Sequence, residues 1–358
     1  MASEGVLIYG GGISGMVAAY NLVRKGHDVV VREREAGFGG WDIFNPSTHT
    51  TPLDLEATSE YIGIDISPAF HPVSSLSVYL HDFRLEMPVF MAYHVERSSR
   101  EESLDFLLYE KCREAGVSFE FERPLEEGEI DSLPPGTIIA CGLSPEAYDY
   151  LGIPYQRVYA WMARGEKEYH NYAWMWLDEC INEYGYISFC NGIYFNLLFS
   201  YGQEVSREGL ERYREFMLRV EGIQDENWRQ FNGAVPVATG DNPRLQRKGL
   251  IMCGTMSGCF DPFMGFGISG ALVAGKVAAT AVNDMDKAQG EFDRFTRHFA
   301  NVLRFKEEVW YPLRARVDLL EEIARILGPQ RAIRIALEAL KQGRKKSAIP
   351  GFSPLSCH

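Results

Sequence analysis

The sequence predicts an α/β fold with a parallel-sheet domain, an interleaved and mostly antiparallel β-sheet domain, and a C-terminal helical segment. Three observations predict it. A strand–glycine turn–helix–strand pattern begins at Val6, a second glycine-rich strand–helix pattern begins at Leu250, and runs typical of half-buried strands lie between the two. With 358 residues, the chain is long enough for two structural modules that each bury a core.

The first pattern is typical of a dinucleotide-binding unit of the Rossmann type. Val6–Tyr9 is an apolar run without alternation, as in a buried parallel strand. We expect a helix over Met16–Lys25 and a second buried strand over Val29–Val31, which leads to Glu33. The turn between the first strand and the helix holds the glycines of a GxGxxG pattern, Gly10, Gly12 and Gly15.

Each residue of this unit has a physical task. Gly10 permits the tight turn, Gly12 lets the backbone approach a diphosphate, and Gly15 lets the helix pack closely on the strand. The helix N-terminus presents free N–H groups and the positive end of the helix dipole to phosphates, and Ser14 in the turn before it is expected to contact the cofactor. Glu33 can accept hydrogen bonds from both hydroxyls of an adenosine ribose, and its charge disfavours the 2′-phosphate of NADP.

The residues after Glu33 indicate which dinucleotide is bound. Arg34 follows directly, and Gly37, Gly39 and Gly40 come a few residues later. This continuation resembles the glutathione-reductase-type FAD-binding superfamily, in which the acidic residue is followed by a pair of glycines. The resemblance implies that FAD occupies the site and that Arg34, Gly39 and Gly40 contact it.

A second flavin motif is expected far along the chain. Leu250–Cys253 reads as a short buried strand, and a small-residue helix runs to Ala279. The segment between them resembles a motif of the same superfamily, a strand followed by GD and then DPxxGxGI. Thr255 replaces the aspartate that binds the ribityl chain there, so FAD affinity is expected to fall below the family norm. The resemblance assigns cofactor contacts to Gly254, Thr255, Asp261, Gly265, Gly267 and Ile268. We expect Asp261 to act mainly by bonding the backbone of its loop.

Two shorter segments resemble further parts of an FAD site. Thr137–Leu143 resembles the strand that passes near the adenine side of FAD, which brings Gly142 to the cofactor. Arg97–Leu108 resembles the element in which an arginine approaches the flavin at the start of a helix. Arg100 fits that arginine better than Arg97 does, and a surface position for either residue stays open.

Strand-like runs occupy the chain between the flavin segments. Their β-branched and aromatic residues, bounded by glycine and asparagine, predict a mostly antiparallel sheet that carries the substrate site. The predicted strands are Leu76–Leu80, Pro88–Tyr93, Tyr155–Ala163, Gly185–Phe189 and Tyr194–Tyr201, followed by a helix over Val205–Val220.

This layout predicts a discontinuous FAD-binding domain made of residues 1–68, 95–154 and 248–285. The substrate domain takes residues 69–94 and 155–247, and residues 286–358 form a C-terminal helical tail. The interleaving resembles the geranylgeranyl reductase and flavin hydroxylase group, and the stretch DPFMGFGISGAL is closest to the geranylgeranyl reductases. An apolar stripe of the tail is expected to pack on the protein itself, while contact with a partner or a lipid surface stays open. The stripe consists of Ile333, Leu337 and Leu340.

The resemblance implies an FAD-dependent oxidoreductase that reduces or dehydrogenates a lipophilic or aromatic small molecule by hydride transfer at flavin N5. A flavin-dependent monooxygenase is the first alternative, and a cyclase or isomerase that uses flavin without redox chemistry is the second. A halogenase is disfavoured because Trp174 and Trp176 are followed by Leu-Asp, which departs from the WxWxIP motif. The sequence contains one GxGxxG turn after a strand, so the candidate electron donors are NAD(P)H bound without a fold of its own and a ferredoxin as partner protein.

The sequence leaves the catalytic group open. His49, His71, His81 and His94 fall in or beside the predicted substrate region, and Cys259 lies near the second flavin motif. A histidine in such a place is more often a surface or satisfied core residue than a catalytic group. A cysteine is inert unless neighbouring charges lower its pKa.

Composition and motif content argue against several other classes of protein. The net charge of −13 disfavours nucleic acid as a partner, since phosphate binding needs clustered Lys and Arg. The seven cysteines include no CxxC pair and HExxH is absent, so neither a disulfide framework nor a metal site is expected. No signal peptide and no apolar run of about 18 residues is recognisable. These features predict a cytoplasmic protein without a transmembrane segment, and peripheral membrane contact stays open.

Overall fold

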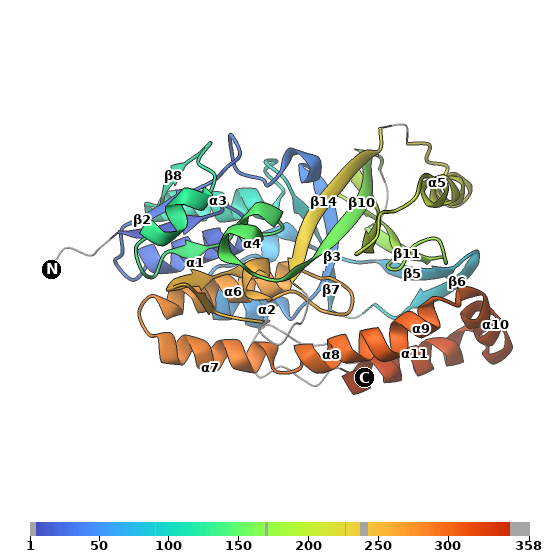
Figure 1. The fold of residues 1–358 in the computed structure, drawn as a ribbon. Coiled ribbons are helices and arrows are strands. Elements are labelled where there is room, and N and C mark those ends of the chain that lie inside the picture. The colour runs from blue at the N-terminus through green and yellow to red at the C-terminus, as the bar shows by residue number, and fades with distance from the viewer. Residues whose placement is uncertain (1–4, 90, 169–170, 226, 237–242, 344–358) are drawn as a thin grey trace.

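The structure is a computed structural model that describes residues 5–89, 91–168, 171–225, 227–236 and 243–343. For residues 339–343 it describes the backbone alone. Figure 1 shows two sheet-containing parts side by side, with the C-terminal helices, coloured orange to red, running along one side of both.

The first part is built on a six-stranded sheet. Its strands are β1 (Val6–Tyr9), β2 (Val29–Arg32), β8 (Ser118–Glu120), β9 (Ile138–Ile139), β15 (Gln246–Arg247) and β16 (Leu250–Met252). The order is β15–β16–β9–β1–β2–β8, and every pair is parallel except β15 with β16. The predicted parallel pairing of the first two strands is confirmed, with Val6 opposite Val29. Both flavin-like segments therefore meet in one sheet.

The helices of the first part are α1 (Ile13–Val23), α2 (Leu55–Ile62), α3 (Leu104–Ala115), α4 (Pro145–Leu151) and α6 (Ile268–Ala281). Helix α1 begins three residues before the predicted Met16, because the chain turns directly from Gly12 into the helix. It packs closely on α6, where a Cβ on Gly275 would lie 2.5 Å from the carbonyl oxygen of Ser14. This contact joins the two predicted motifs in the core.

A seven-stranded, mostly antiparallel sheet forms the second part, as predicted. Its strands are β5 (Ser75–Leu80), β6 (Phe83–Met87), β10 (Tyr155–Glu166), β11 (Tyr172–Leu177), β12 (Gly185–Cys190), β13 (Ile193–Tyr201) and β14 (Arg229–Pro236). The order is β14–β10–β13–β12–β11–β5–β6, and only β5 and β11 run parallel.

A third sheet has three strands that alternate in the sequence with strands of the other two sheets. It consists of β3 (Ser47–Pro52), β4 (Phe70–Pro72) and β7 (Ala92–Arg97). The strand expected over Pro88–Tyr93 is wrong: β6 ends at Met87 and β7 begins at Ala92, in the described residues on either side. A proline cannot donate a hydrogen bond to a sheet ladder, so it falls between the strands.

The two faces of the seven-stranded sheet differ. Helix α5 (Arg207–Glu221) covers one face, where Tyr213 and Phe216 pack with Trp174 and Trp176. Successive residues of a strand point to opposite faces. Tyr186 accordingly lies in a different cluster from its neighbour Ile187, which packs under α5. The face away from α5 is therefore free to form the wall of a cavity.

The C-terminal segment contains α7 (Met285–Thr296), α8 (Phe299–Phe305), a π-helical turn (Lys306–Trp310), α9 (Tyr311–Arg314), α10 (Val317–Leu327) and α11 (Pro329–Gly343). In the predicted apolar stripe, Ile333 packs on a cluster that includes Leu80 and Val317, and Leu337 is half-buried. The side chain of Leu340 lies outside the described residues. Packing on the protein itself is thus confirmed for Ile333.

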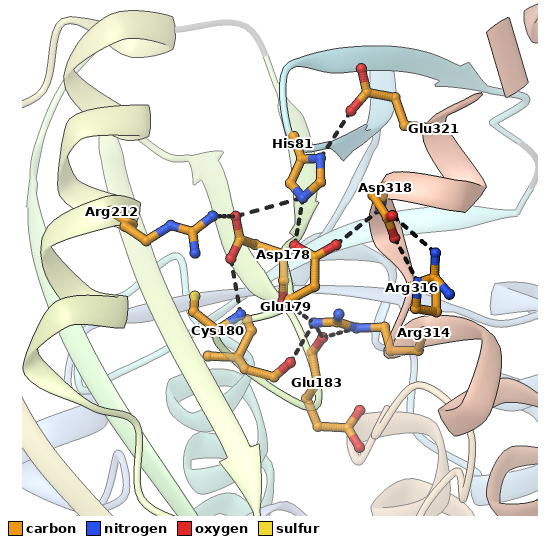
Figure 2. A network of polar contacts seen from close by, with 11 residues as sticks. His81, Asp178, Glu179, Cys180, Glu183, Arg212, Arg314, Arg316, Asp318 and Glu321 are labelled. Carbon is orange, nitrogen blue, oxygen red and sulfur yellow. Dashed lines mark hydrogen bonds and ion pairs between the residues drawn. The ribbon is translucent and has the colours of Figure 1, made fainter. Parts of the chain in front are cut away.

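Polar contacts clasp this segment to the loop between β11 and β12 (Figure 2). The buried Arg314 donates hydrogen bonds of 2.7–2.9 Å to the carbonyl oxygens of Asp178, Ile181 and Glu183. Lys306, also buried, pairs with the carboxylate of Glu183 at 2.8 Å. The loop continues into Tyr184, so the C-terminal helices help to fix the start of β12.

His81 forms a second part of this clasp. Its Nδ1 lies 2.9 Å from Glu321 on α10, and its Nε2 lies 2.6 Å from Glu179 in the loop, with Asp178 at 3.9 Å. Burial by itself would lower the pKa of His81, but the hydrogen bonds to Glu179 and Glu321 and the charge of Asp178 outweigh it and raise the pKa. Protonated His81 therefore links α10 to the sheet.

This ion-pair link predicts a pH-dependent stability. Because the folded-state pKa of His81 is raised, its contribution is fully present below about pH 6.5, the unfolded value, and is lost as pH rises through the folded pKa. We expect His81→Asn to lower the melting temperature at pH 6 by about 2 °C and to have a smaller effect at pH 8.5. Asparagine tolerates the left-handed backbone of this position, where φ is 50°. Thermal unfolding of both proteins between pH 5.5 and 8.5 measures this difference, and an equal loss at every pH would contradict it.

Candidate functional site

A cavity of about 540 Å³ extends from the glycine turn after β1 to the free face of the seven-stranded sheet. Its volume is in the usual range for small-molecule and cofactor sites. Residues from both flavin-like motifs and from the predicted substrate sheet line the same cavity.

The glycine turn has the close contacts that its residue types predict. Gly10 has a φ of 105°, and a Cβ there would lie 2.3 Å from the carbonyl oxygen of Ala140 in the neighbouring strand segment. A Cβ on Gly15 would lie 1.9 Å from the carbonyl oxygen of Gly10. A Cβ on Gly12, by contrast, meets nothing within 4 Å. Gly12 lines the cavity, so a side chain there would enter space that the protein leaves open.

Glu33 lies at the edge of the cavity beside this turn. It is buried, and its carboxylate accepts hydrogen bonds from the backbone N–H of Gly11 at 2.7 Å and of Glu35 at 3.0 Å. These bonds hold the carboxylate in place and leave lone pairs on both oxygens. Arg34 stacks on the ring of Trp41 at 3.9 Å, and both residues line the cavity.

The second motif is in contact with the first. A Cβ on Gly254, where φ is 62°, would lie 2.5 Å from Oγ of Ser14. Thr255, Gly265, Gly267 and Ile268 line the cavity where α6 begins. Asp261 accepts a hydrogen bond of 2.6 Å from the N–H of Met264. Asp261 is thus bonded to the backbone of its loop, as the sequence predicts.

The structure brings most of the predicted cofactor residues to the cavity wall, Gly39, Gly40 and Gly142 among them. The predicted residues outside the wall are Gly15, Arg100, Gly254 and Asp261. The two glycines pack behind the wall, and Arg100 lies beside Glu96 at 3.4 Å and donates to the carbonyl oxygen of Asn191.

Arg97, which fits the arginine of the flavin motif less well than Arg100 does, lines the cavity instead. It is the last residue of β7, and its guanidinium donates two hydrogen bonds, of 2.6 and 2.9 Å, to the buried Asp105 at the start of α3. The charge of Arg97 is balanced by this carboxylate. Its place could not be predicted because it depends on how β7 pairs with β3.

We call the part of the cavity lined by β3, β10, β12, β13 and β14 the chamber. Its wall includes the aromatic residues Tyr186, Phe199, Tyr201 and Phe231, with Phe44 beside them. Within the described residues, none of these five strands contributes a charged side chain to the cavity wall. The charged lining residues outside the chamber are Arg32, Glu33, Arg34, Arg97, Arg123 and Glu146. The five chamber strands thus contribute no charged lining residue among the described ones, while Arg97 on β7 lies opposite Ser47 of β3.

Sequence reasoning missed the role of β3 as a whole. Ser47, His49, Thr50 and Thr51 all line the cavity, yet only His49 stood out as a candidate. The available signal was the run STHTT, whose hydroxyl-bearing and β-branched residues suit a strand without an apolar face. The residues Arg123–Leu125 were missed as well, since nothing in their types marks a cavity.

The cysteines near the cavity are unreactive. Cys141 lines the wall, and burial raises its pKa to about 12. Burial also raises the pKa of Cys259 to about 12. Both thiols stay protonated near neutral pH, so neither supplies a thiolate nucleophile.

One group of potential metal ligands lies outside the cavity. His81, Asp178 and Glu179 each place one ligand atom within 4.8 Å of the others (Figure 2). Both ring nitrogens of His81 already have carboxylate partners, and Asp178 also pairs with Arg212 at 2.5 Å. We interpret this group as part of the C-terminal clasp.

Comparison with known proteins agrees with this geometry. Residues 8–57 match the family model of the NAD(P)-binding Rossmann-like domain. This segment of the chain thus has a Rossmann-like fold. The match contains the end of β1, the glycine turn, α1, β2 and β3, and residues from each of them line the cavity.

The chain is also similar, over short stretches, to curated proteins of Arabidopsis thaliana. It is 42% identical over 62 residues to the flavin-containing monooxygenase FMO GS-OX2 and 43% identical over 56 residues to FMO GS-OX4. These matches cover 17% and 16% of the chain, and 14% and 12% of the two relatives. The likeness is thus confined to a small part of each protein.

Solved structures share the fold over nearly the whole chain. A geranylgeranyl bacteriochlorophyll reductase-like protein from Thermoplasma acidophilum superposes with a TM-score of 0.71, 17% identity and 97% coverage of both chains. The p-nitrophenol 4-monooxygenase PnpA from Pseudomonas putida DLL-E4 has a TM-score of 0.58, 16% identity and coverage of 96% and 99%. The predicted fold, a Rossmann-like FAD-type domain with an interleaved sheet and a helical C-terminal segment, is confirmed. None of the helices in the described part of the chain combines the length and the apolar character that a membrane span requires.

Proposed function

We propose that this protein is an FAD-dependent oxidoreductase that reduces or dehydrogenates a lipophilic or aromatic small molecule. One observation carries the proposal: a single cavity joins a dinucleotide-binding glycine turn to an aromatic chamber. A cofactor held at the turn and a substrate held in the chamber would therefore meet inside the protein. The flavin fold of the solved neighbours supports this view.

The residues present fit FAD. The open space over Gly12 and the free N–H groups at the start of α1 suit a diphosphate. Glu33 suits the adenosine ribose, and Thr255 can offer a hydroxyl to the ribityl chain. The start of α6 at Ile268 presents a second set of helix N–H groups to the cavity, where they favour negative charge.

The chain supplies position and environment, while bound FAD supplies hydride exchange with a substrate or reaction with oxygen. The aromatic chamber wall excludes water from the reacting groups and favours an apolar ligand. The hydroxyl of Tyr184 donates a 2.5 Å hydrogen bond to the carbonyl oxygen of Met264, which ties the chamber to the glycine-rich loop before α6. This bond fixes the position of the chamber relative to the glycine-rich loop.

Replacement of Glu33 by glutamine is expected to weaken FAD binding about tenfold, since charge-assisted hydrogen bonds to a ribose are lost. The dissociation constant of FAD, measured by flavin fluorescence on cofactor-free protein, checks this. The matched control is Glu114→Gln, because Glu114 is exposed and pairs with Lys111 outside the cavity wall. An unchanged constant for Glu33→Gln would remove the ribose assignment.

A flavin-dependent monooxygenase is a second candidate, favoured by the similarity of a short stretch of the chain to flavin-containing monooxygenases. Anaerobic reduction with NADH, NADPH or a reduced ferredoxin, followed by admission of air, separates the candidates. Rapid reoxidation with substrate-stimulated oxygen uptake would favour the monooxygenase. Slow reoxidation in air with transfer of electrons to a substrate would favour the oxidoreductase, and turnover without any bleaching would favour non-redox use.

A further inference from the structure

His49 brings an imidazole ring to the chamber wall. It lies on β3, and its Nε2 is 2.9 Å from Oγ of Ser47. Within the described residues, no hydrogen-bond partner is found for Nδ1 of His49. The ring is half-buried, packs 5.5 Å from the ring of Phe195, and lines the cavity.

Strand β3 supplies the polar part of the chamber wall. Residues two apart on a strand share a face, so Ser47, His49 and Thr51 form a polar row, and all three line the cavity together with Thr50. The aromatic wall of β12, β13 and β14 forms another side of the same space. The chamber thus combines one polar strip with apolar and aromatic surface.

The electrostatic environment of the chamber excludes a charged ligand. Burial, with the charge of Arg97 as a second cause, lowers the pKa of His49 to about 3, so its imidazole is neutral near pH 7. Arg97 is itself paired with Asp105. A carboxylate or ammonium group in the chamber would lose its hydration without gaining an unpaired counter-charge, which is strongly unfavourable.

We propose that the chamber binds an uncharged, flat and mostly apolar ligand whose single hydroxyl or carbonyl group hydrogen-bonds the ring of His49. The proposal rests on the proposed function, since it names the substrate class of the same site. His49 acts here by binding and orienting the ligand. A neutral imidazole serves both kinds of polar group, because its tautomers present a donor or an acceptor at Nδ1.

Three small probes of similar shape test the proposal on protein saturated with FAD. They are p-xylene, p-cresol and 4-methylbenzoate, which differ in having no polar group, a neutral hydroxyl and a negative charge. We expect p-cresol to bind about threefold to tenfold more tightly than p-xylene, and 4-methylbenzoate to bind more weakly than both. Isothermal titration calorimetry measures the three affinities.

The variant His49→Leu is expected to bind p-cresol and p-xylene with equal affinity, because it removes the hydrogen bond and keeps an apolar wall. The matched control is His27→Leu, since His27 bonds Asn283 away from the cavity, and it should keep the preference of the natural protein. A role of His49 in stability alone would change both affinities together and leave their ratio intact.

Each other result overturns the proposal. Tighter binding of 4-methylbenzoate, an unchanged preference for p-cresol in His49→Leu, or no binding of any probe would each contradict it. Failure of the proposed function is seen separately, as natural protein that does not take up FAD. The two failures therefore have different readouts.

Discussion

Replacing Gly12 with valine is expected to give a folded protein that purifies almost without flavin. A Cβ at this position meets no protein atom within 4 Å and projects into the cavity. The backbone there, with φ −78° and ψ −175°, is open to any residue, so folding should be preserved. The branched side chain would keep a diphosphate from the N–H groups of α1. Loss of those charge-assisted bonds is expected to lower the bound flavin at least about tenfold.

Flavin released by denaturation and quantified against protein concentration checks this result. The matched control is Gly128→Val, because a Cβ on Gly128 also meets nothing within 4 Å but lies on the exposed surface outside the cavity wall. That control should retain the natural flavin content. Equal flavin content in Gly12→Val, with a native circular dichroism spectrum, would contradict the placement of the cofactor at the glycine turn.

Replacement of Arg314 by methionine is expected to cost about 3 kcal/mol or more of unfolding free energy. Methionine fills part of the volume but leaves the carbonyl oxygens of Asp178, Ile181 and Glu183 without their donor. It also takes positive charge from the buried surroundings of Glu183. Urea denaturation followed by fluorescence measures the change in unfolding free energy. The dependence of that free energy on urea concentration should be the same for the natural protein and the variant, so that the two unfold in the same kind of transition.

Arg316→Met provides the matched control for this clasp. Arg316 is exposed and pairs only with Asp318 among the described residues, so its replacement should change stability little. An equal loss of stability in both variants would mean that the buried Arg314 stabilises the protein no more than the exposed Arg316 does. A small loss in Arg314→Met would mean that the 178–183 loop is held by other contacts.

The motifs that rely on neighbouring residues could be predicted from the sequence. The glycine turn from Gly10 to Gly15, the acid at Glu33 and the loop that Asp261 holds are local features, and their geometry follows from residue type and spacing. The ends of the helices and strands were predicted less closely. Helix α1 begins at Ile13, before the predicted residue, and the segment expected as a strand at Pro88 separates two strands.

The distinction between Arg97 and Arg100 shows where local reasoning ends. Arg97 ends β7 and Arg100 lies three residues later, and spacing alone favoured Arg100. The pairing of β7 with β3 and the ion pair with Asp105 bring Arg97 to the cavity, while Glu96 and Asn191 hold Arg100 elsewhere. Contacts between residues far apart in the chain decide such cases.

The sequence by itself determined the dinucleotide turn, the interleaved order of the two sheet regions and the helical character of the C-terminal segment, because hydrophobic period and glycine spacing act over a few residues. Only the tertiary structure decided that β3 lends a polar row to an otherwise apolar chamber and that Arg314 clasps the loop before Tyr184. These features depend on strand pairing and on burial of single charges. Such contacts join residues distant in the chain, and residue type and local spacing do not reveal them.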